Sequence, residues 1–188
     1  MEGAKAPLSC YSDAMFRLLL LRHSKAVPFM GSGDHDRALT ERGRSDAARL
    51  GAFLASEKIA PQAAVHSGAR RTKETLAIVL GKLEPGIKAS AEPRLYNATD
   101  AAFLSVVRHS PDAAQTLLLV GHNPTMAEMA CRLAGTGERS AMARMAAKFP
   151  TSALAVVDFD ADHWSEIGEG MGRLVHFATP ASLGGQGD

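Results

Sequence analysis

Short apolar runs alternate along the chain with longer segments whose apolar residues recur at helical spacing. A short apolar run bounded by turn residues is typical of a buried strand, whereas recurrence every three to four positions indicates a helix with one packed face. The strands predicted in this way are residues 16–21, 63–66, 87–91, 116–120, 153–159 and 174–177. The predicted helices are residues 40–56, 71–83, 100–109 and 125–133.

Strands that alternate with helices predict an α/β fold of three layers, with a mainly parallel central sheet and helices on both faces. The last two strands are candidates for an antiparallel pair. We expect a single domain over residues 15–180, preceded by an N-terminal extension (1–14) and followed by a glycine-rich, flexible tail (181–188). In such sheets ligands bind beyond the carboxyl ends of the strands.

Composition narrows the possible functions. With 188 residues and 46% hydrophobic content, the chain can build one full core. A formal net charge of +1 argues against nucleic-acid binding through bulk positive charge. Cys10 and Cys131 form no Cys-x-x-Cys pair, so neither a disulfide framework nor a structural zinc site is expected. No apolar run approaches the roughly 18 residues of a membrane span, and residues 1–13 do not resemble a signal peptide, so we expect a cytoplasmic protein that does not bind membranes.

Arginine and histidine residues follow three of the predicted strands. The first strand ends in Arg22-His23, the second is followed by Arg70 and Arg71, and the fourth ends before His122. Parallel neighbours would bring these groups to one edge of the sheet, and such a cluster of cations is costly unless an anion joins it.

A phosphoryl group suits this predicted cluster. Arginine binds phosphate oxygens with two parallel hydrogen bonds, and the helix N-termini after Arg71 and Asn123 would add backbone N–H donors. Gly121 would let the backbone approach the ligand closely. A neutral imidazole has a lone pair near pH 7, so His23 is a candidate nucleophile toward phosphorus.

Four segments resemble the histidine phosphatase superfamily, in the branch that includes the phosphoglycerate mutases, and within it the small SixA-type phosphohistidine phosphatases. They are Leu-Leu-Leu-Leu-Arg-His-Ser (18–24), Asp-Arg-Ala-Leu-Thr-Glu-Arg-Gly (36–43), Ser-Gly-Ala-Arg-Arg-Thr-Lys-Glu-Thr (67–75) and Val-Gly-His-Asn-Pro (120–124). The resemblance covers residues 16–177 and implies a phosphoglycerate-mutase-like fold. It also implies a phosphatase that forms a covalent phosphohistidine and needs no cofactor or metal.

The resemblance also implies roles for single residues. His23 matches the nucleophile, Arg22 and Arg71 match the two phosphate-binding arginines, and His122 matches the second histidine, which binds phosphate and stabilises the transition state. Further substrate-binding residues are expected among the neighbours of these four. They are Ser24, Arg70, Gly121 and Asn123, of which Arg70 fits the motif spacing less well than Arg71.

Two positions depart from the family pattern. Ser24 replaces a glycine or alanine, which adds only a hydroxyl group. Asn97 stands near the position of a glutamate that protonates the leaving alcohol, and asparagine cannot do this. Glu92, Asp100 or an acid of the 34–36 segment could take its place, and spacing does not select among them.

The missing glutamate bears on the substrate. An alkoxide leaving group needs a general acid, whereas phosphohistidine releases an imidazole, whose conjugate acid has a pKa near 7. The sequence therefore favours a phosphohistidine protein or a small, activated phosphorylated molecule as substrate. The chain is also too short for the large insertions of a mutase.

Two other functions remain open. A metal-dependent hydrolase could use Asp34, His35 and Asp36 with His23 and His122, although these residues lack a clear ligand spacing. A non-catalytic protein could bind phosphorylated partners in the same pocket, although binding alone does not require a nucleophile. Among other residues, His66 and His109 are expected to be structural or exposed, Trp164 to be a packing residue, and His163 and His176 have no expected role.

Overall fold

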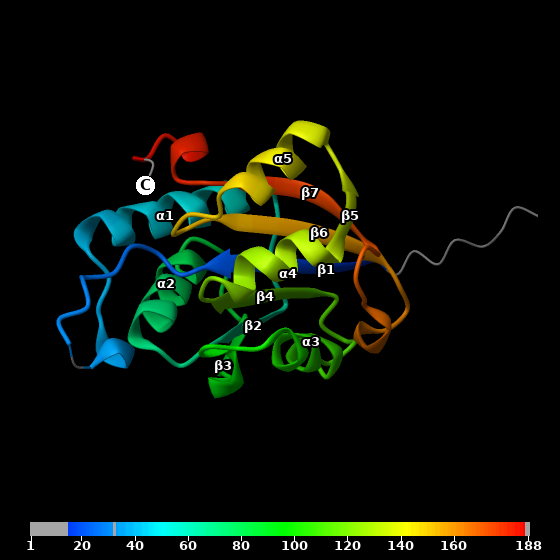
Figure 1. The fold of residues 1–188 in the computed structure, drawn as a ribbon, viewed down its shortest axis with the longest axis horizontal. Coiled ribbons are helices and arrows are strands. Elements are labelled where there is room, and N and C mark those ends of the chain that lie inside the picture. The colour runs from blue at the N-terminus through cyan, green and yellow to red at the C-terminus, as the bar shows by residue number, and fades with distance from the viewer. Residues whose placement is uncertain (1–14, 32, 187–188) are drawn as a thin grey trace, which may run out of the picture.

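The computed structural model describes residues 15–31 and 33–186, so the expected extension 1–14 lies outside the described residues. Within these ranges seven strands form one sheet, in the order β3-β2-β4-β1-β6-β7-β5 (Figure 1). The strands are β1 (Met15–Arg22), β2 (Ala63–His66), β3 (Lys88–Ala91), β4 (Thr116–Gly121), β5 (Ala134–Gly137), β6 (Leu154–Asp160) and β7 (Gly172–Ala178). β6 is antiparallel to its neighbours β1 and β7, and the other strand pairs are parallel.

The central strand β1 is buried on both faces. Leu18 and Leu20 pack into the core on one side of the sheet, and Leu19 and Leu21 pack into the core on the other side. This follows from the alternation of side chains along a strand, and it explains why residues 18–21 of β1 form a continuous apolar run. β1 pairs in register with β4 on one side and with β6 on the other, so the end of β1 lies in the middle of the sheet.

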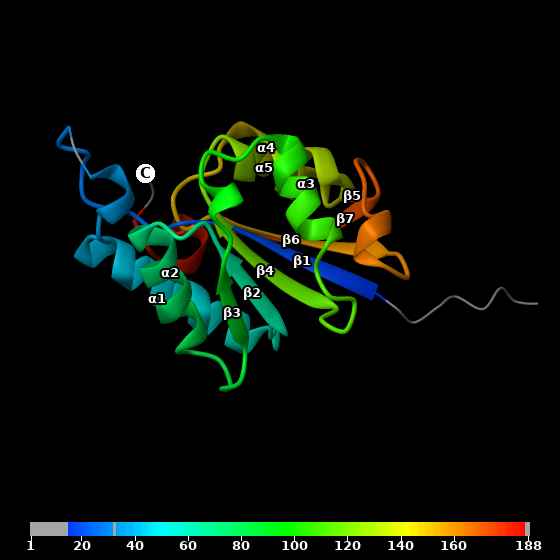
Figure 2. The same ribbon diagram turned by 90° about the horizontal axis from the view of Figure 1, so that it is seen from below.

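Helices cover both faces of the sheet (Figure 2). On one face lie α1 (Glu41–Ser56) and α2 (Arg70–Leu80), and on the other lie α3 (Asp100–Arg108), α4 (Thr125–Leu133) and α5 (Arg139–Ala147). The segments between and after these elements contain four short 3-10 turns: η1 (Asp34–Asp36), η2 (Pro93–Leu95), η3 (Trp164–Glu166) and η4 (Ala181–Leu183). The three-layer α/β fold expected from the sequence is confirmed, as is the antiparallel pairing of the last two predicted strands.

The segment after α4 differs from the sequence-based expectation, which ended the helix at residue 133 and predicted no further element before residue 153. Instead β5 pairs with β7 at the edge of the sheet, and α5 follows. Residues with small side chains have low strand propensity, but here they permit close packing, because a Cβ atom on Gly135 would lie 1.9 Å from the carbonyl oxygen of Gly170. The Glu138 side chain caps α5 by accepting from the backbone N–H of Ser140 and Ala141.

Residues 181–186 of the expected flexible tail contain η4, and the backbone oxygen of Gln186 accepts a hydrogen bond from Arg42 of α1 at 2.8 Å. Trp164 is fully buried, stacks edge-on against Phe16 and donates its Nε1–H to the oxygen of Ala114, so its expected packing role is confirmed. No helix within the described ranges has the length and apolar composition required to cross a membrane.

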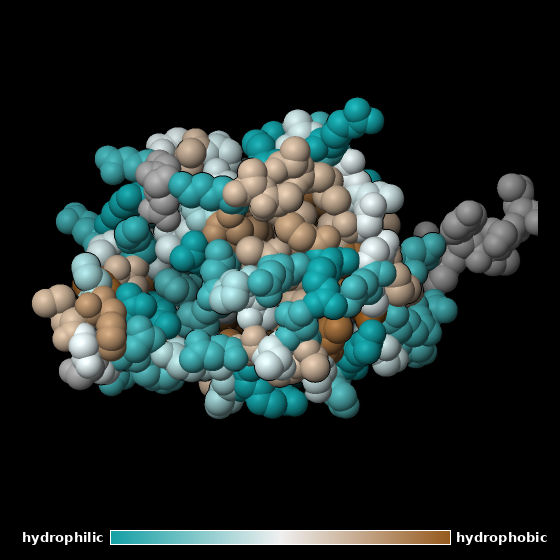
Figure 3. All heavy atoms as spheres, viewed as in Figure 1, coloured by the Kyte–Doolittle hydropathy of each residue, from teal (hydrophilic) through white to brown (hydrophobic). Residues whose placement is uncertain are grey.

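Apolar residues gather on the surface over α5 (Figure 3). Next to this surface is a cavity of about 570 Å³ between α5 and the end of β7. Its lining residues are Arg144, Ala147, Lys148, Pro150, Phe177, Thr179, Pro180, Ala181 and Ser182. None of the candidate site residues lines this cavity.

Candidate active site

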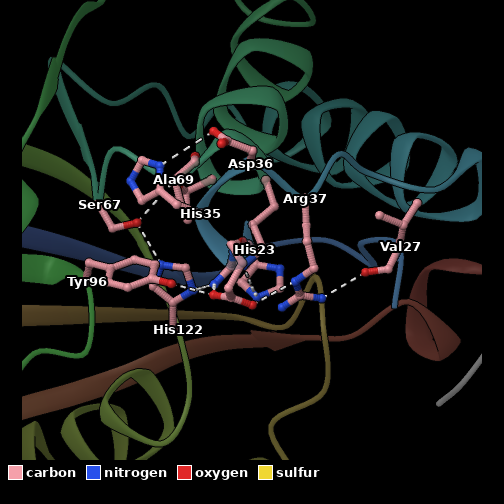
Figure 4. Close-up of polar contacts among 12 residues, drawn as sticks. His23, Val27, His35, Asp36, Arg37, Ser67, Ala69, Tyr96 and His122 are labelled. Atoms are coloured by element: carbon pink, nitrogen blue, oxygen red, sulfur yellow. Dashed lines mark hydrogen bonds and ion pairs between the residues drawn. The ribbon is translucent and has the colours of Figure 1, made fainter. Parts of the chain in front are cut away.

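Two histidines lie side by side where β1 and β4 end. Arg22 is in register with Gly121, and the backbone N–H of His23 donates to the Gly121 oxygen at 3.0 Å. This pairing places His23 beside His122, and the centres of the two rings are 5.1 Å apart (Figure 4). The expectation that parallel strands bring these two histidines together is met by the geometry.

The His23 ring is held in one tautomer. Its Nδ1 lies 2.7 Å from the Ser24 carbonyl oxygen, which can only accept, so Nδ1 carries the proton. Nε2 then has the lone pair, and Arg71 Nε–H donates to it at 3.3 Å. Ser24 is fully buried, with its N–H on Thr75 Oγ1 and its Oγ accepting from Ser152. Ser24 therefore orients the ring through its backbone carbonyl.

Arg71, in the first turn of α2, connects three segments of the site. In addition to its contact with His23, its Nη1 donates to the Asp34 backbone oxygen at 2.6 Å and its Nη2 to Asp34 Oδ2 at 3.1 Å. Nη2 also donates to His122 Nδ1 at 3.2 Å. These contacts use four of the five N–H groups of a guanidinium. An anion that binds Arg71 through two parallel hydrogen bonds must therefore take at least one that is now used within the site.

His122 is held from its other side by a chain of hydroxyl groups. Because Arg71 donates to Nδ1, the proton of the neutral ring is on Nε2, which donates to Ser67 Oγ at 2.6 Å. Ser67 in turn contacts Thr72 Oγ1 at 3.1 Å, and Thr72 donates to the Ala69 oxygen at 2.8 Å. Every proton in this series of hydrogen bonds has an acceptor, so the orientation of the His122 ring is fixed.

Tyr96 and Arg37 complete the mouth of the site. The Tyr96 ring packs edge-on against His122, with centres 5.1 Å apart, and its hydroxyl donates to Asp34 Oδ2. Arg37 donates to Asp34 Oδ1 at 2.8 Å and to the Val27 oxygen at 2.8 Å (Figure 4). The Asp34 carboxylate thus bridges Arg37, Arg71 and Tyr96.

The environment keeps both imidazoles neutral near pH 7. Burial lowers the pKa of His23 to about 4, together with the nearby cations Arg71, Arg22 and Arg37 and against the hydrogen bond to Ser24. Burial, followed by the charges of His23 and Arg71, lowers the pKa of His122 to about 3. The hydrogen bond from Tyr96, aided by Arg71 and Arg37, lowers the pKa of Asp34 to about 2, so this carboxyl group is ionised.

Three of the remaining predicted residues, Arg22, Asn123 and Gly121, make contacts within the fold. Arg22 Nη1 and Asn123 Nδ2 both donate to the Phe149 oxygen, at 2.9 and 3.0 Å, and so tie the ends of β1 and β4 to the segment after α5. Gly121 packs against Met126, because a Cβ atom there would lie 2.8 Å from its sulfur. The structure thus gives Gly121 a packing role inside the fold, because a side chain there would displace Met126.

Arg70 has a different partner from Arg71. Its Nε–H donates to Glu74 Oε1 at 2.7 Å on the exposed side of α2, so the structure separates these two adjacent arginines. One residue apart on a helix, they point about 100° away from each other, and only Arg71 faces the sheet edge. The weaker ranking of Arg70 by motif spacing agrees with this arrangement.

The candidates for the missing glutamate are also separated. Asn97 adopts a left-handed backbone conformation with φ of 52°, which asparagine tolerates in turns. Glu92 forms an ion pair with Arg94, and Asp100 contacts Arg132. Of the three alternatives considered, the 34–36 segment supplies the acid that contacts the cluster, through Asp34.

Sequence reasoning overlooked three contributors to the site: Arg37, Ser67 as the partner of His122, and Tyr96. Arg37 lies three positions after Asp34. This spacing within a polar loop was the sequence signal for their ion pair. The roles of Ser67 and Tyr96 depend on tertiary contacts between distant segments. His66 accepts from the N–H of Gly68, which agrees with a structural role.

This arrangement can bind a tetrahedral anion next to a neutral imidazole. Buried arginine provides charge and directional N–H groups, and the Nε2 lone pair of His23 faces the same space. Within the part of the chain that the structure describes, no group of three or more His, Cys, Asp or Glu residues could hold a metal ion. The metal-dependent alternative therefore has no ligand set there.

Comparisons with known proteins identify the family of this chain. The family model "Histidine phosphatase superfamily (branch 1)" matches residues 18–99. Uncharacterized protein Rv1276c of Mycobacterium tuberculosis is 37% identical over 164 residues, which cover 85% of this chain and 99% of the relative. The structure of a protein assigned as the phosphohistidine phosphatase SixA from Agrobacterium tumefaciens is 30% identical, with a TM-score of 0.74 and coverage of 88% of this chain and 98% of that chain.

A phosphoglycerate mutase from Plasmodium falciparum is 18% identical, with a TM-score of 0.57 and coverage of 91% of this chain and 93% of that chain, and it shows a shared fold alone. The expected phosphoglycerate-mutase-like fold is thereby confirmed. Together with the paired histidines and Arg71 at the strand ends, these matches establish that the chain belongs to branch 1 of the histidine phosphatase superfamily and is a phosphatase of the SixA type.

Proposed function

We propose that this phosphatase acts through a covalent phosphohistidine on His23 and that its substrates carry an activated phosphoryl group, foremost phosphohistidine in proteins. The observation that carries the proposal is the fixed tautomer of His23. Its Nδ1 is occupied by the Ser24 carbonyl, and its Nε2 faces Arg71. With a pKa of about 4, the ring keeps its lone pair at pH 7.

In the proposed reaction, His23 Nε2 attacks phosphorus, a P–N bond forms, and the bond to the leaving group breaks. Water then attacks phosphorus and the P–N bond breaks, so phosphate leaves with the protons of that water and the neutral imidazole is regenerated. Arg71, His122 and Arg22 would surround the phosphoryl oxygens and stabilise their charge in the transition state. In this proposal the incoming phosphate takes over Arg71 hydrogen bonds that Asp34 now accepts.

The preference for activated phosphates rests on the leaving group. Asn97 cannot donate a proton as an acid, and imidazole leaves more easily than an alkoxide. The similarity to a protein assigned as a phosphohistidine phosphatase supports the same substrate class. A phosphorylated protein is therefore the proposed partner, and a small activated phosphate is the alternative substrate.

The test compares a phosphohistidine peptide, a phosphoserine peptide and a sugar phosphate as substrates of the wild-type protein and of the His23→Ala and His109→Ala variants. His109 lies at the exposed end of α3, with its Nδ1 on the Ser105 oxygen, and serves as the control histidine. We expect the phosphohistidine peptide to react fastest and His23→Ala to be inactive. An acid-labile, base-stable phosphoryl label should form on wild-type protein.

The outcomes separate the alternatives. Full activity of His23→Ala would contradict the proposed nucleophile, and faster turnover of the sugar phosphate would contradict the proposed substrate class. Binding of a phosphate analogue without turnover of any substrate would indicate the non-catalytic alternative.

A further inference from the structure

The site lacks an obvious source of the proton that a basic leaving group needs. Asn97 cannot supply it, and the carboxylates of Glu92 and Asp100 are paired with arginines outside the cluster. The Asp34 carboxyl group, in contrast, contacts Arg71, which also contacts both histidines. Its position at the mouth of the site makes it accessible to a substrate.

We propose that Asp34 is the proton donor to leaving groups more basic than imidazole, and that Tyr96 is a positioning residue for its carboxyl group. This inference rests on the proposed function and assigns the acid that the sequence motif leaves open. Asp34 and His23 contact different nitrogens of the same guanidinium, with His23 on Nε and Asp34 on both terminal nitrogens. A phosphoryl group held by Arg71 would therefore have Asp34 and His23 as neighbours at the same time.

The charge balance around Asp34 changes when substrate binds. The carboxylate contacts Arg37 on its own turn, Arg71 on α2 and the Tyr96 hydroxyl, and its charge also acts on the His122 ring. A phosphate dianion that takes the Arg71 hydrogen bonds removes one cation from Asp34 and places negative charge beside it. Both changes raise the pKa of a carboxyl group, so substrate binding favours the protonated form.

The proton can then be followed through the reaction. As the P–O bond to the leaving group breaks and the P–Nε2 bond forms, the Asp34 O–H transfers its proton to the leaving oxygen, and Asp34 becomes a carboxylate. In the second step the carboxylate accepts a proton from the water that attacks phosphohistidine. Asp34 is therefore regenerated in each cycle, as the reversal of acid and base roles requires.

The experiment compares Asp34→Asn with Asp36→Asn on a series of phosphate monoesters. Asp36 is two residues away on the same turn, and its side chain is exposed, with His35 3.9 Å away, so it is the matched control. The substrates are p-nitrophenyl phosphate, phenyl phosphate and an alkyl phosphate, whose leaving groups become steadily more basic. We expect Asp34→Asn to lower kcat on the alkyl phosphate by about 10²-fold or more and on p-nitrophenyl phosphate only slightly.

The KM values and pH profiles distinguish acid catalysis from a purely structural role. Asp34→Asn removes a carboxylate that competes with phosphate for Arg71, so KM should stay the same or fall. The wild-type kcat on phenyl phosphate should decrease as the pH rises past the pKa of the bound-state acid, and this limb should be absent in Asp34→Asn. Tyr96→Phe removes the hydrogen bond that most lowers the pKa of Asp34, so the limb should move to higher pH.

An equal loss of kcat on all three esters, or no loss, would overturn the role of Asp34 while leaving the nucleophile in place. The same conclusion would follow if Asp36→Asn behaved like Asp34→Asn. A wild-type protein that forms no phosphoenzyme and turns over none of the substrates would instead overturn the proposed function, and the inference with it. If the descending limb of the pH profile did not move in Tyr96→Phe, only the positioning role of Tyr96 would be overturned.

Discussion

The Nε–H of Arg71 lies 3.3 Å from Nε2 of His23, so a buried cation and the proposed attacking nitrogen are already aligned before substrate arrives. Three further guanidinium N–H groups donate to His122 and Asp34. A single side chain thereby fixes the relative positions of three groups that come from three distant segments of the chain.

This alignment predicts that Arg71→Lys is far more damaging than Arg70→Lys. Lysine cannot span His23, His122 and Asp34, whereas Arg70 is exposed and pairs with Glu74. We expect Arg71→Lys to lower kcat/KM by about 10²-fold or more and Arg70→Lys to leave it within about twofold. Steady-state kinetics on a phosphohistidine peptide measures both, and equal losses in the two variants would contradict the assignment of Arg71.

Ser67→Ala tests the hydroxyl chain behind His122. The variant leaves the buried Nε2–H of His122 without its acceptor, and Thr72 Oγ1 loses the hydrogen bond from Ser67. We expect a loss of about 1–3 kcal/mol in the free energy of unfolding and a lower kcat, because the ring can rotate. Urea unfolding and kinetics provide the two measurements. In wild-type protein, ¹⁵N NMR should show the proton of His122 on Nε2, and a proton on Nδ1 would refute the proposed chain.

The lowered histidine pKa values predict how stability depends on pH. An unfolded histidine has a pKa near 6.5. Below that pH, His23 and His122 bind protons in the unfolded chain but stay neutral in the folded state. Stability should therefore fall as the pH is lowered from about 6.5 toward the folded pKa values of about 4 and 3. Between pH 7 and pH 5 the loss should be at least about 2 kcal/mol.

Urea unfolding at both pH values measures this loss. His23→Gln should show a smaller pH dependence than wild type. His163 is the control, because its hydrogen bond and charge interaction with Asp112 raise its pKa, so His163→Gln should not reduce the dependence. A wild-type stability that does not change between pH 7 and pH 5 would disprove the neutral, buried state of the two rings.

Gly43→Ala tests the packing that supports the segment after β1. A Cβ atom on Gly43 would lie 2.0 Å from the backbone oxygen of Lys25, and the same oxygen accepts from Thr40 N–H. Backbone must therefore move, next to Ser24. We expect a loss of about 1–3 kcal/mol in unfolding free energy and reduced activity. Gly168→Ala is the control, since its Cβ would first meet the flexible Met171 side chain, 3.2 Å from the sulfur.

The fold was largely predictable because the apolar runs have clear periods. β1 and β4 each contain a continuous apolar run, and α1 begins directly after its N-cap Thr40, whose side chain accepts from Gly43 N–H. β5 was not predictable from periodicity, because its sequence, Ala-Gly-Thr-Gly, has the composition of a turn. It becomes a strand through its pairing with β7, a tertiary contact that local propensity does not encode.

The site was predictable where motif residues directly follow strands. His23 and His122 follow β1 and β4, so topology alone brings them together. Asp34 and Tyr96 come from the loops around η1 and η2, whose positions depend on how each loop folds over the sheet edge. A sequence pattern indicates that a loop is polar, but it does not indicate which of its acids turns inward. The selection of Asp34 over Glu92 and Asp100 required coordinates.

The position of β1 between β4 and β6 has a consequence for how the protein acquires its activity. Both partners of β1, β4 and β6, come much later in the sequence, so β1 cannot complete its pairing until most of the chain has been synthesised. Such high contact order slows folding, and the two imidazoles come together only after β1 has paired with β4. Recovery of turnover during refolding should therefore report this long-range pairing, later than the far-ultraviolet signal of the helices.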